Sequence, residues 1–383
     1  MKVYPTPILV RTDLQAHISS RALMNNLRNL RGLCRRGTRF CAVVKANAYG
    51  HGIREVVEVL RLTDVDFYAV CSIHEAIHIS ERVRGKPILI LEPMHTAEPP
   101  EFFPACADSQ FHRVATSLEA VDCAAGHLRG SDKVLNLHVN LETGMGRCGI
   151  EPELAVRLIQ RIRQEPNLKL AGIYTHFATA DEEDLSYARE QLQRFNRFLA
   201  EQQLLGKPDL LIHSANSAAT IKLKEAHFDM VRCGISLYGY FSRPMTHPPI
   251  PLEPAMRLEA PIVQLKTLPA GQPVSYGRSF VTQRPTIVGM LPMGYADGYW
   301  RCFSNQAVMK IGSTVVPVIG RVCMDQVLID VTDVPDAHIG QMATVIDDHH
   351  DSPCGVYALA DLAQTICYEI LTSVHAHVNR IVH

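Results

Sequence analysis

The strongest constraint on the fold is a series of eight short apolar segments that alternate with helical patterns between residues 39 and 232. This alternation is typical of βα units that build a parallel sheet. In the stretch 151–165, Leu154, Leu158 and Ile162 recur on one face of a helix. Eight such units predict an α/β fold, a (β/α)8 barrel of the TIM type over residues 12–250. The predicted strands are 39–45, 66–71, 87–91, 112–117, 134–140, 169–176, 209–213 and 229–232.

From about residue 251 the pattern changes to frequent turns and short β-rich runs. The stretch 247–251 contains three prolines, which cannot continue a helix, and it marks the junction. Residues 251–383 are therefore predicted to form a mainly β C-terminal domain, and the N-terminal segment 1–11 is a candidate addition to it. The predicted strands of this domain include 261–265, 286–291, 315–319 and 327–331.

Charge and cysteine content restrict the classes of function. The chain has 38 basic and 39 acidic residues, so no net field favours nucleic acid or an anionic membrane. No apolar run has the length of a membrane helix, and the first residues lack the apolar core of a signal peptide. The 11 cysteines form no CxxC pair, which argues against a disulfide framework and a structural zinc site. We expect a soluble, cytoplasmic protein whose partner is a small molecule or a second copy of itself.

Lys45 is the first candidate for chemistry. It stands at the carboxyl end of the first predicted strand, the face of a barrel where active sites gather. Phe40, Ala42 and Val43 precede it, and apolar neighbours disfavour a charged amine, which makes it a better nucleophile and imine former. The alternative is a lysine that ends a strand and reaches water, and this residue alone does not decide between the two.

The segment around this lysine, VVKANAYGHG at 43–52, resembles the cofactor-lysine motif of the alanine racemase family. Further matches follow in the same order and extend the resemblance to residue 326. The family's fold agrees with the barrel and β domain predicted from the strand pattern. The further matches are ETGMGRCG (142–149), THFATADE (175–182), HSANSAA (213–219), VRCGISLYG (231–239), VSYGRSF (274–280), GYADGYWR (294–301) and GRVCMDQ (320–326).

The resemblance implies an isomerase that interconverts L- and D-alanine, with pyridoxal 5'-phosphate held by Lys45 as a Schiff base. Inverting a stereocentre needs proton transfer on both faces, and the resemblance gives one face to Lys45 and the other to Tyr276 of the partner subunit. A phenol is almost fully protonated at neutral pH, and the implied chain of His176 and Arg232 would lower its pKa. Arg232 would also donate to the pyridine nitrogen, which makes the ring a weaker electron sink.

The same resemblance assigns the cofactor phosphate to backbone and hydroxyl donors. Ser217 starts the helix after the seventh predicted strand, and Gly234 and Ile235 follow the eighth, where barrels commonly hold phosphate. Tyr49 completes this set. Asn216 is also expected at the cofactor, and the role of a helix cap is compatible with that position.

Substrate contacts are implied in both subunits. Arg147 resembles the arginine that binds the substrate carboxylate, aided by the backbone amide of Met324. Because the family's substrate corridor takes residues from two chains, the resemblance implies a homodimer with shared active sites. The matching corridor positions are Asp181 from one subunit and Tyr295, Arg301 and Arg321 from the other.

Two positions depart from the family pattern. Many members carry a carbamylated lysine where this chain has Asn140, so the orientation of Arg147 must depend on another group, such as a bound anion. The tyrosine that usually touches the phosphate and narrows the pocket is replaced by Ala376. Exchanging an aromatic ring for a methyl group opens space, which predicts that serine or larger amino acids are accepted as well.

Alternatives to an alanine-specific enzyme therefore stay open. They are a racemase of broader specificity, a decarboxylase of the same barrel type and a carrier of pyridoxal phosphate. A decarboxylase needs a stronger electron sink than Arg232 allows, and a carrier does not need Tyr276. We assign no metal, because the cluster around His349 and His350 is typical of a solvated turn and the pair of histidines at 375 and 377 lacks a third ligand.

Overall fold

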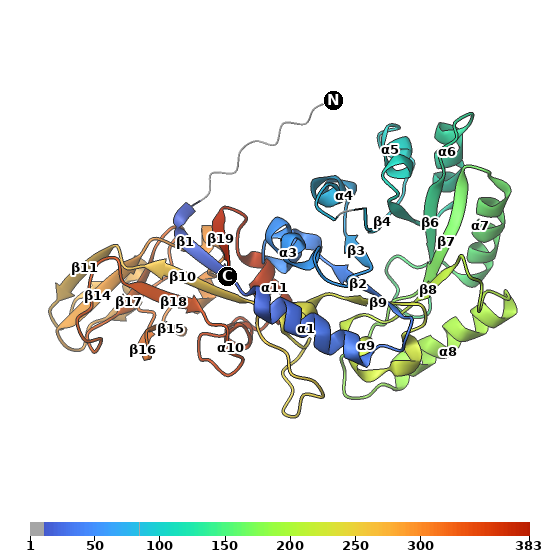
Figure 1. Cartoon of the computed structure of the whole chain (residues 1–383). Helices are drawn as coiled ribbons and strands as arrows, with labels where there is room; N and C mark the ends of the chain where they lie inside the picture. Colours follow the sequence, from blue (N-terminus) through green and yellow to red (C-terminus); the bar gives the residue numbers. More distant parts are fainter. Residues whose placement is uncertain (1–10, 84) are drawn as a thin grey trace.

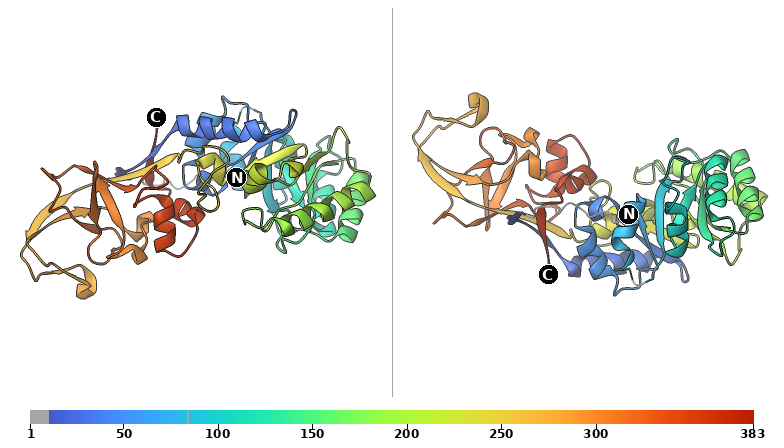
Figure 2. Two further views of the ribbon diagram at one scale, coloured as in Figure 1. Left: turned by 90° about the horizontal axis from the view of Figure 1, so that it is seen from below. Right: turned by 90° about the horizontal axis from the view of Figure 1, so that it is seen from above.

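The computed structural model describes residues 11–83 and 85–383. Figure 1 shows an α/β lobe, formed by the first part of the chain, beside a β-rich lobe formed by the last part. The views from below and above in Figure 2 show the same elongated arrangement. Helix α11 (Cys367–Ser373) lies at the junction and packs against the segment that follows the first barrel strand.

In the described part of the chain, eight parallel strands close into a barrel, which confirms the predicted fold class. All positions of β3 are buried, and so are all but the first of β2. Strands covered on both faces are apolar almost throughout, and for this reason they were visible in the sequence. The barrel strands are β2 (Arg39–Val43), β3 (Phe67–Val70), β4 (Ile88–Pro93), β5 (His112–Ala115), β6 (Leu135–Asn140), β7 (Leu168–Tyr174), β8 (Leu211–His213) and β9 (Met230–Cys233).

Helices cover the outside of the barrel (Figure 1). The helix predicted at 151–165 is α7, which begins at Pro152 and buries Leu158 and Ile162 on its inner face. No helix among residues 11–83 and 85–383 has the length and apolar character that a membrane span requires. The longer helices of this lobe are α1 (Ser20–Leu33), α3 (Ile53–Leu60), α4 (Ile73–Ser80), α5 (Phe102–Asp108), α6 (Leu118–Leu128), α7 (Pro152–Gln164), α8 (Ser186–Glu201) and α9 (Ser217–Lys222).

The β-rich lobe contains a mixed sheet with the order β16-β15-β18-β10-β1-β19 and a smaller sheet with the order β11-β14-β17. The helix α10 (Val356–Leu362) packs beside α11. The strands are β1 (Arg11–Ile18), β10 (Met256–Pro261), β11 (Gln264–Leu268), β12 (Pro273–Val274), β13 (Phe280–Val281), β14 (Thr286–Leu291), β15 (Val308–Ile311), β16 (Thr314–Pro317), β17 (Val327–Asp330), β18 (Met342–Ile346) and β19 (Val378–Val382).

Two sequence-based boundaries need correction. The barrel was predicted to begin at residue 12, but β1 pairs with β10 and β19 in the sheet of the other lobe. The candidate addition of segment 1–11 falls almost entirely on residues 1–10, which lie outside the described part. The strand predicted at 261–265 is interrupted, because Ile262 donates to Gln341 of one sheet and Val263 to Met290 of the other. The chain changes sheets at this point.

Candidate active site

A cavity of 680 Å³ opens at the carboxyl ends of the barrel strands. Lys45, two residues after the end of β2, lies in its wall, as do residues at or after the ends of most of the other strands. The sequence-predicted residues that the structure brings together here are Lys45, Tyr49, Asn140, Arg147, His176, Asp181, Asn216, Ser217, Arg232, Gly234 and Ile235.

Lys45 opens a left-handed helical turn, α2 (Lys45–Tyr49). The three residues Ala46, Asn47 and Ala48 have φ values of 52°, 53° and 53°. This conformation costs a residue other than glycine about 1–2 kcal/mol, so the surrounding structure must hold it in place. The carboxylate of Glu75 accepts the amide of Ala46 at 2.7 Å, and the amide oxygen of Asn47 accepts the backbone N–H of Ile53 at 2.9 Å. The strained turn allows both Lys45 and Tyr49 to line the cavity.

The β-rich lobe supports the same turn from the other side. The guanidinium of Arg380 donates to the carbonyl of Gly50 at 2.8 Å and to that of Val374 at 2.9 Å. Gly50 has a φ of +83°, and a Cβ at this position would lie 1.9 Å from the carbonyl oxygen of Leu371 in α11. The backbone after Lys45 is therefore fixed by direct contact between the lobes.

Replacing Gly50 by alanine is expected to lower the free energy of unfolding by about 2–5 kcal/mol, because it adds both left-handed strain and a steric clash. Gly37→Ala is the matched control. Gly37 has a φ of +91° and open space around it, so Gly37→Ala should lower the free energy of unfolding by only about 1–2 kcal/mol. Urea unfolding of both variants measures the difference. Equal losses would show that the close approach of α11 contributes nothing.

Arg232 on β9 is buried and makes an unusual set of hydrogen bonds. It donates to the ring nitrogen Nδ1 of His213 at 2.8 Å, to Nδ1 of His176 at 3.2 Å and to the carbonyls of Thr175 and Ser214. Its guanidinium also lies 5.0 Å from the ring centroid of Tyr174. No carboxylate pairs with it among the described residues. Burial lowers the pKa of Arg232, and burial together with the neighbouring arginine lowers the pKa of His176 to about 3.

Hydrogen-bond donors suited to a phosphate gather near α9 and β9. The hydroxyl of Ser217 accepts the backbone N–H groups of Gly234 at 2.9 Å and of Ser236 at 3.4 Å. A Cβ on Gly234 would lie 2.3 Å from the hydroxyl of Tyr49, so only glycine leaves room for that ring. Asn216 caps α9 by accepting the N–H of Ala219 at 3.0 Å, which confirms its predicted role as a cap. Hydroxyls and backbone amides gathered in one place fit an anionic oxygen group.

Arg147 lines the cavity as well. The loop that carries it is shaped by Glu142, whose carboxylate accepts the backbone N–H groups of Met145 at 2.6 Å and Gly146 at 2.9 Å. Arg147 is exposed and forms no ion pair within residues 11–83 and 85–383, so its guanidinium is available to a carboxylate ligand. Asn140 lines the same cavity.

The predicted residues of the β-rich lobe are not in the cavity. Tyr276 lies in η3 (Tyr276–Arg278), and its side chain is 70% exposed, so it is not the core residue that a tyrosine in a β-rich segment usually is. Arg321 packs over Gly277 beside it. Met324 accepts a backbone hydrogen bond from the turn η4 (Tyr295–Asp297), which presents Tyr295. These residues and the exposed Arg301 in η5 (Arg301–Phe303) lie on the surface of the lobe.

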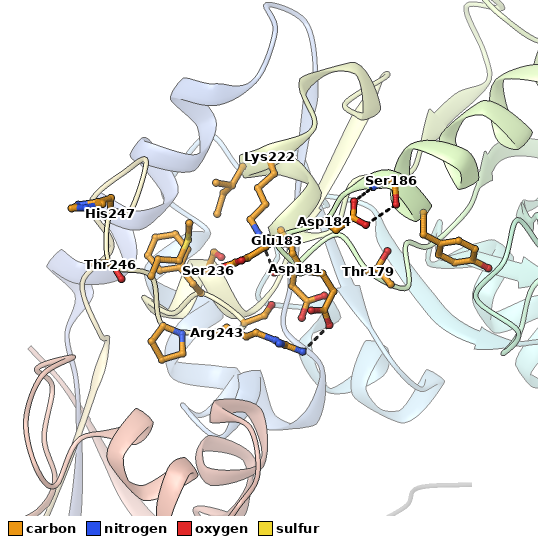
Figure 3. A pocket seen from close by; sticks show the side chains of 18 residues that line it. Thr179, Asp181, Glu183, Asp184, Ser186, Lys222, Ser236, Arg243, Thr246 and His247 are labelled. Carbon is orange, nitrogen blue, oxygen red and sulfur yellow. Dashed lines mark hydrogen bonds and ion pairs between the residues drawn. The ribbon is translucent and has the colours of Figure 1, made fainter.

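Another cavity, of 690 Å³, shares Asp181, Ala218 and Ser242 with the first. Figure 3 shows its lining, with Asp181 and Lys222 among the labelled residues. The side chain of Lys222 reaches the backbone carbonyl of Asp181 at 2.9 Å, and Arg243 forms an ion pair of 2.7 Å with Glu182. Both cations are thus already bonded within the protein. The predicted corridor residue Asp181 stands in the wall between the two cavities.

The polar clusters outside the cavity have structural partners. Asp347, which precedes His349 and His350, is buried and forms an ion pair of 2.8 Å with Lys310. The prediction of a solvated turn is therefore wrong for this residue. Its ligand atom lies within 4.8 Å of those of Asp348 and His349. His377 contacts the buried carboxylate of Asp297 at 2.7 Å.

Comparisons with known proteins identify the family. The family model described as "Alanine racemase, N-terminal domain" matches residues 18–242, and "Alanine racemase, C-terminal domain" matches residues 255–382. The chain belongs to the alanine racemase family. Curated alanine racemases of Carboxydothermus hydrogenoformans and Desulfosudis oleivorans are 37% and 34% identical to it, over 96% of this chain and 98% and 95% of their own lengths.

Solved alanine racemases have the same architecture. The protein of Clostridium difficile 630 has a TM-score of 0.89 at 29% identity and covers 98% of this chain and 96% of its own. That of Bacillus anthracis, solved with bound L-Ala-P, has a TM-score of 0.86 at 30% identity and covers 97% and 95%. This alanine racemase is an isomerase that interconverts L- and D-alanine, and the predictions of family, fold class and enzyme class are confirmed.

Several residues that hold this alanine racemase site together were not found from its sequence. Glu75 and Asn47 hold the left-handed turn, and Arg380 joins it to the other lobe. His138 and His213 extend the network of Arg232. The sequence signal was weak, since His138 is one of three polar residues that alternate with apolar ones along β6.

Ala376, the departure from the racemase pattern, is exposed after α11 and does not line the cavity. The aromatic residue that α11 contributes to the cavity wall is Tyr368, whose hydroxyl is 2.8 Å from that of Ser242. The ring centroid of Tyr368 lies 6.0 Å from that of Tyr49.

Proposed function

We propose that alanine racemisation in this protein uses pyridoxal 5'-phosphate held by Lys45, and that Tyr276 of the partner subunit acts on the opposite face of the substrate. The observation that carries this proposal is one cavity that combines a primary amine, a phosphate-type donor set and the guanidinium of Arg232. When bound, pyridoxal phosphate supplies an electron sink that makes the Cα–H bond of an amino acid acidic.

Other residues of the cavity would bind the phosphate, contact the ring nitrogen and orient the substrate. Ser217, Tyr49 and the backbone amide of Ile235 would bind the phosphate, and Gly234, whose N–H donates to Ser217 Oγ, would hold that hydroxyl at the cofactor. Arg232 has an Nε–H group without a protein acceptor among the described residues, and this arginine lines the cavity, so a donor is left for the ring nitrogen. Arg147 would orient the substrate carboxylate through its planar fork.

Proton transfer at Cα then needs a base on each face. Lys45 would remove or return the proton on one face. His176, whose Nδ1 accepts from Arg232, would present its Nε2–H to the phenol of the second base, stabilising a phenolate. Within one chain the exposed Tyr276 lies outside the cavity, which favours a homodimer in which each chain completes its partner's site.

Mixing two inactive variants tests this shared arrangement. In a mixed dimer of Lys45→Ala and Tyr276→Ala chains, one site carries both defects and the other carries neither. Subunit exchange in an equal mixture should restore about a quarter of the wild-type racemase activity, because half of the dimers are mixed and each has one intact site. If both residues act within one chain, the mixture stays inactive.

Substrate range and location are further proposals. Acceptance of serine or larger amino acids besides alanine rests on the sequence departure at Ala376 alone, because this residue does not line the cavity within one chain. An assay of Cα–H exchange across L- and D-amino acids would measure the substrate range. The family assignment favours a racemase over a decarboxylase or a carrier of pyridoxal phosphate. The eleven cysteines are free thiols, which supports the cytoplasm as the location.

A further inference from the structure

A line of hydrogen-bonded histidines leads from Arg232 away from the cavity. His213 Nε2 is 2.8 Å from His138 Nδ1, and His138 Nε2 is 2.8 Å from His112 Nδ1. The three rings come from strands β8, β6 and β5. Between β8 and β6 runs β7, where a Cβ on Gly172 would lie 2.2 Å from His138 Nδ1. The glycine leaves the space that the line needs, so the line is a built feature of the barrel.

Arg232 gives this line a direction. A guanidinium only donates, so His213 must accept at Nδ1 and carry its proton on Nε2. That proton points at His138 Nδ1, which places the proton of His138 on Nε2, facing His112 Nδ1. Each neutral ring therefore turns its lone pair toward Arg232 and its N–H group away from it. A proton added to an accepting nitrogen would break a link.

The surroundings keep the rings neutral. His138 and His213 are fully buried, and burial together with cationic neighbours lowers their pKa values well below the usual range. Burial, Lys169 and Arg39 lower the pKa of His112 to about 4. The remaining charged neighbours of the network, near His176, are Arg147 and Lys45, which are also cations. No acidic side chain faces these rings within the described residues.

We propose that His112, His138 and His213 take the place that a carboxylate would have beside a buried arginine, as positioning residues that hold Arg232 without neutralising it. Three aligned neutral rings accept the N–H group that Arg232 donates to His213, and they leave the positive charge of Arg232 unpaired beside the cavity. If pyridoxal phosphate binds as proposed above, on which this inference rests, the charge of Arg232 faces the cofactor ring. His112, which does not line the cavity, thus influences the cofactor from a distance.

Selective 15N labelling of histidine in the holoenzyme tests the direction of the line. Single His→Gln variants assign the signals, and the two ring nitrogens report the tautomer. We expect all three rings to be neutral and protonated on Nε2 at neutral pH. A ring protonated on Nδ1, or on both nitrogens, overturns the proposal. The tautomers are read in the wild-type protein, and the variants serve only to assign its signals.

A matched pair of variants tests the effect at a distance. His112→Gln keeps an acceptor for the Nε2–H of His138, whereas His112→Met has a similar size and no such acceptor. We expect His112→Met to lose the single tautomer of His138, to shift the pH titration of the cofactor absorbance and to lower kcat about five- to tenfold with KM unchanged. His112→Gln should retain all three. If His112→Gln and His112→Met behave alike, the role of His112 is only to pack against Phe67, and the proposal is overturned.

The tautomers can be read with and without pyridoxal phosphate. A protein with the expected tautomers that shows no cofactor absorbance would refute the proposed function and leave the line intact. A protein that binds the cofactor but shows mixed tautomers would refute the line alone.

Discussion

Replacing Lys45 by alanine should abolish racemisation, with a loss of at least about 10³-fold in kcat. The amine of Lys45 is proposed both to hold the cofactor covalently and to exchange a proton with the substrate carbon, so one change removes two functions. The visible absorbance of bound pyridoxal phosphate should be lost or shifted, and borohydride should no longer fix the cofactor to the chain. Enzyme assays and absorbance spectra of the purified protein measure both effects.

Two controls distinguish the loss of the Lys45 amine from the loss of a positive charge and from the general effect of removing a lysine. Lys45→Arg keeps a cation at the same position but cannot form an imine, and it should be as inactive as Lys45→Ala. Lys207→Ala removes an exposed lysine in the loop before β8 and should leave activity within twofold of the wild type. Racemisation by Lys45→Ala at more than a tenth of the wild-type rate would exclude the proposed role.

Much of the barrel could be predicted because its physics is local. Strands buried on both faces appear as apolar runs, and this located all eight strands near their observed bounds. The strand β1 was missed although Leu14, Ala16 and Ile18 alternate with less buried residues, the pattern of a half-buried strand. A strand that pairs with segments more than two hundred residues away is not recognised as part of their sheet from its own sequence.

The geometry of the site could not be predicted in the same way. Of Ala46, Asn47 and Ala48, only the asparagine tolerates the left-handed region well. The turn is held because Glu75 bonds to Ala46 and Arg380 to the adjoining Gly50 from distant parts of the chain. Such strain is stored where the surrounding structure determines the backbone. The motif thus identified the family and the lysine, but tertiary contacts decide where the amine points.

The exposed position of Tyr276 was likewise not visible in the sequence, and it leads to a prediction about stereochemistry. Tyr276→Phe removes the proposed acid and base of one face and leaves Lys45 on the other. Racemisation should fall by about 10²- to 10⁴-fold. In deuterated water, the enantiomer whose Cα–H faces Lys45 should still exchange that proton for deuterium with retention, whereas the other enantiomer should stop exchanging. Proton magnetic resonance of L- and D-alanine, incubated separately, measures the two rates.

The asymmetry between enantiomers is what distinguishes a second base from a residue that only shapes the pocket. Tyr295→Phe is the matched control, since Tyr295 is an exposed tyrosine of the same lobe with no proposed proton to transfer. It should change the exchange of both enantiomers by similar factors. If Tyr276→Phe also slowed both equally, a single base would have to serve both faces, and the phenol of the partner subunit would have no role in proton transfer.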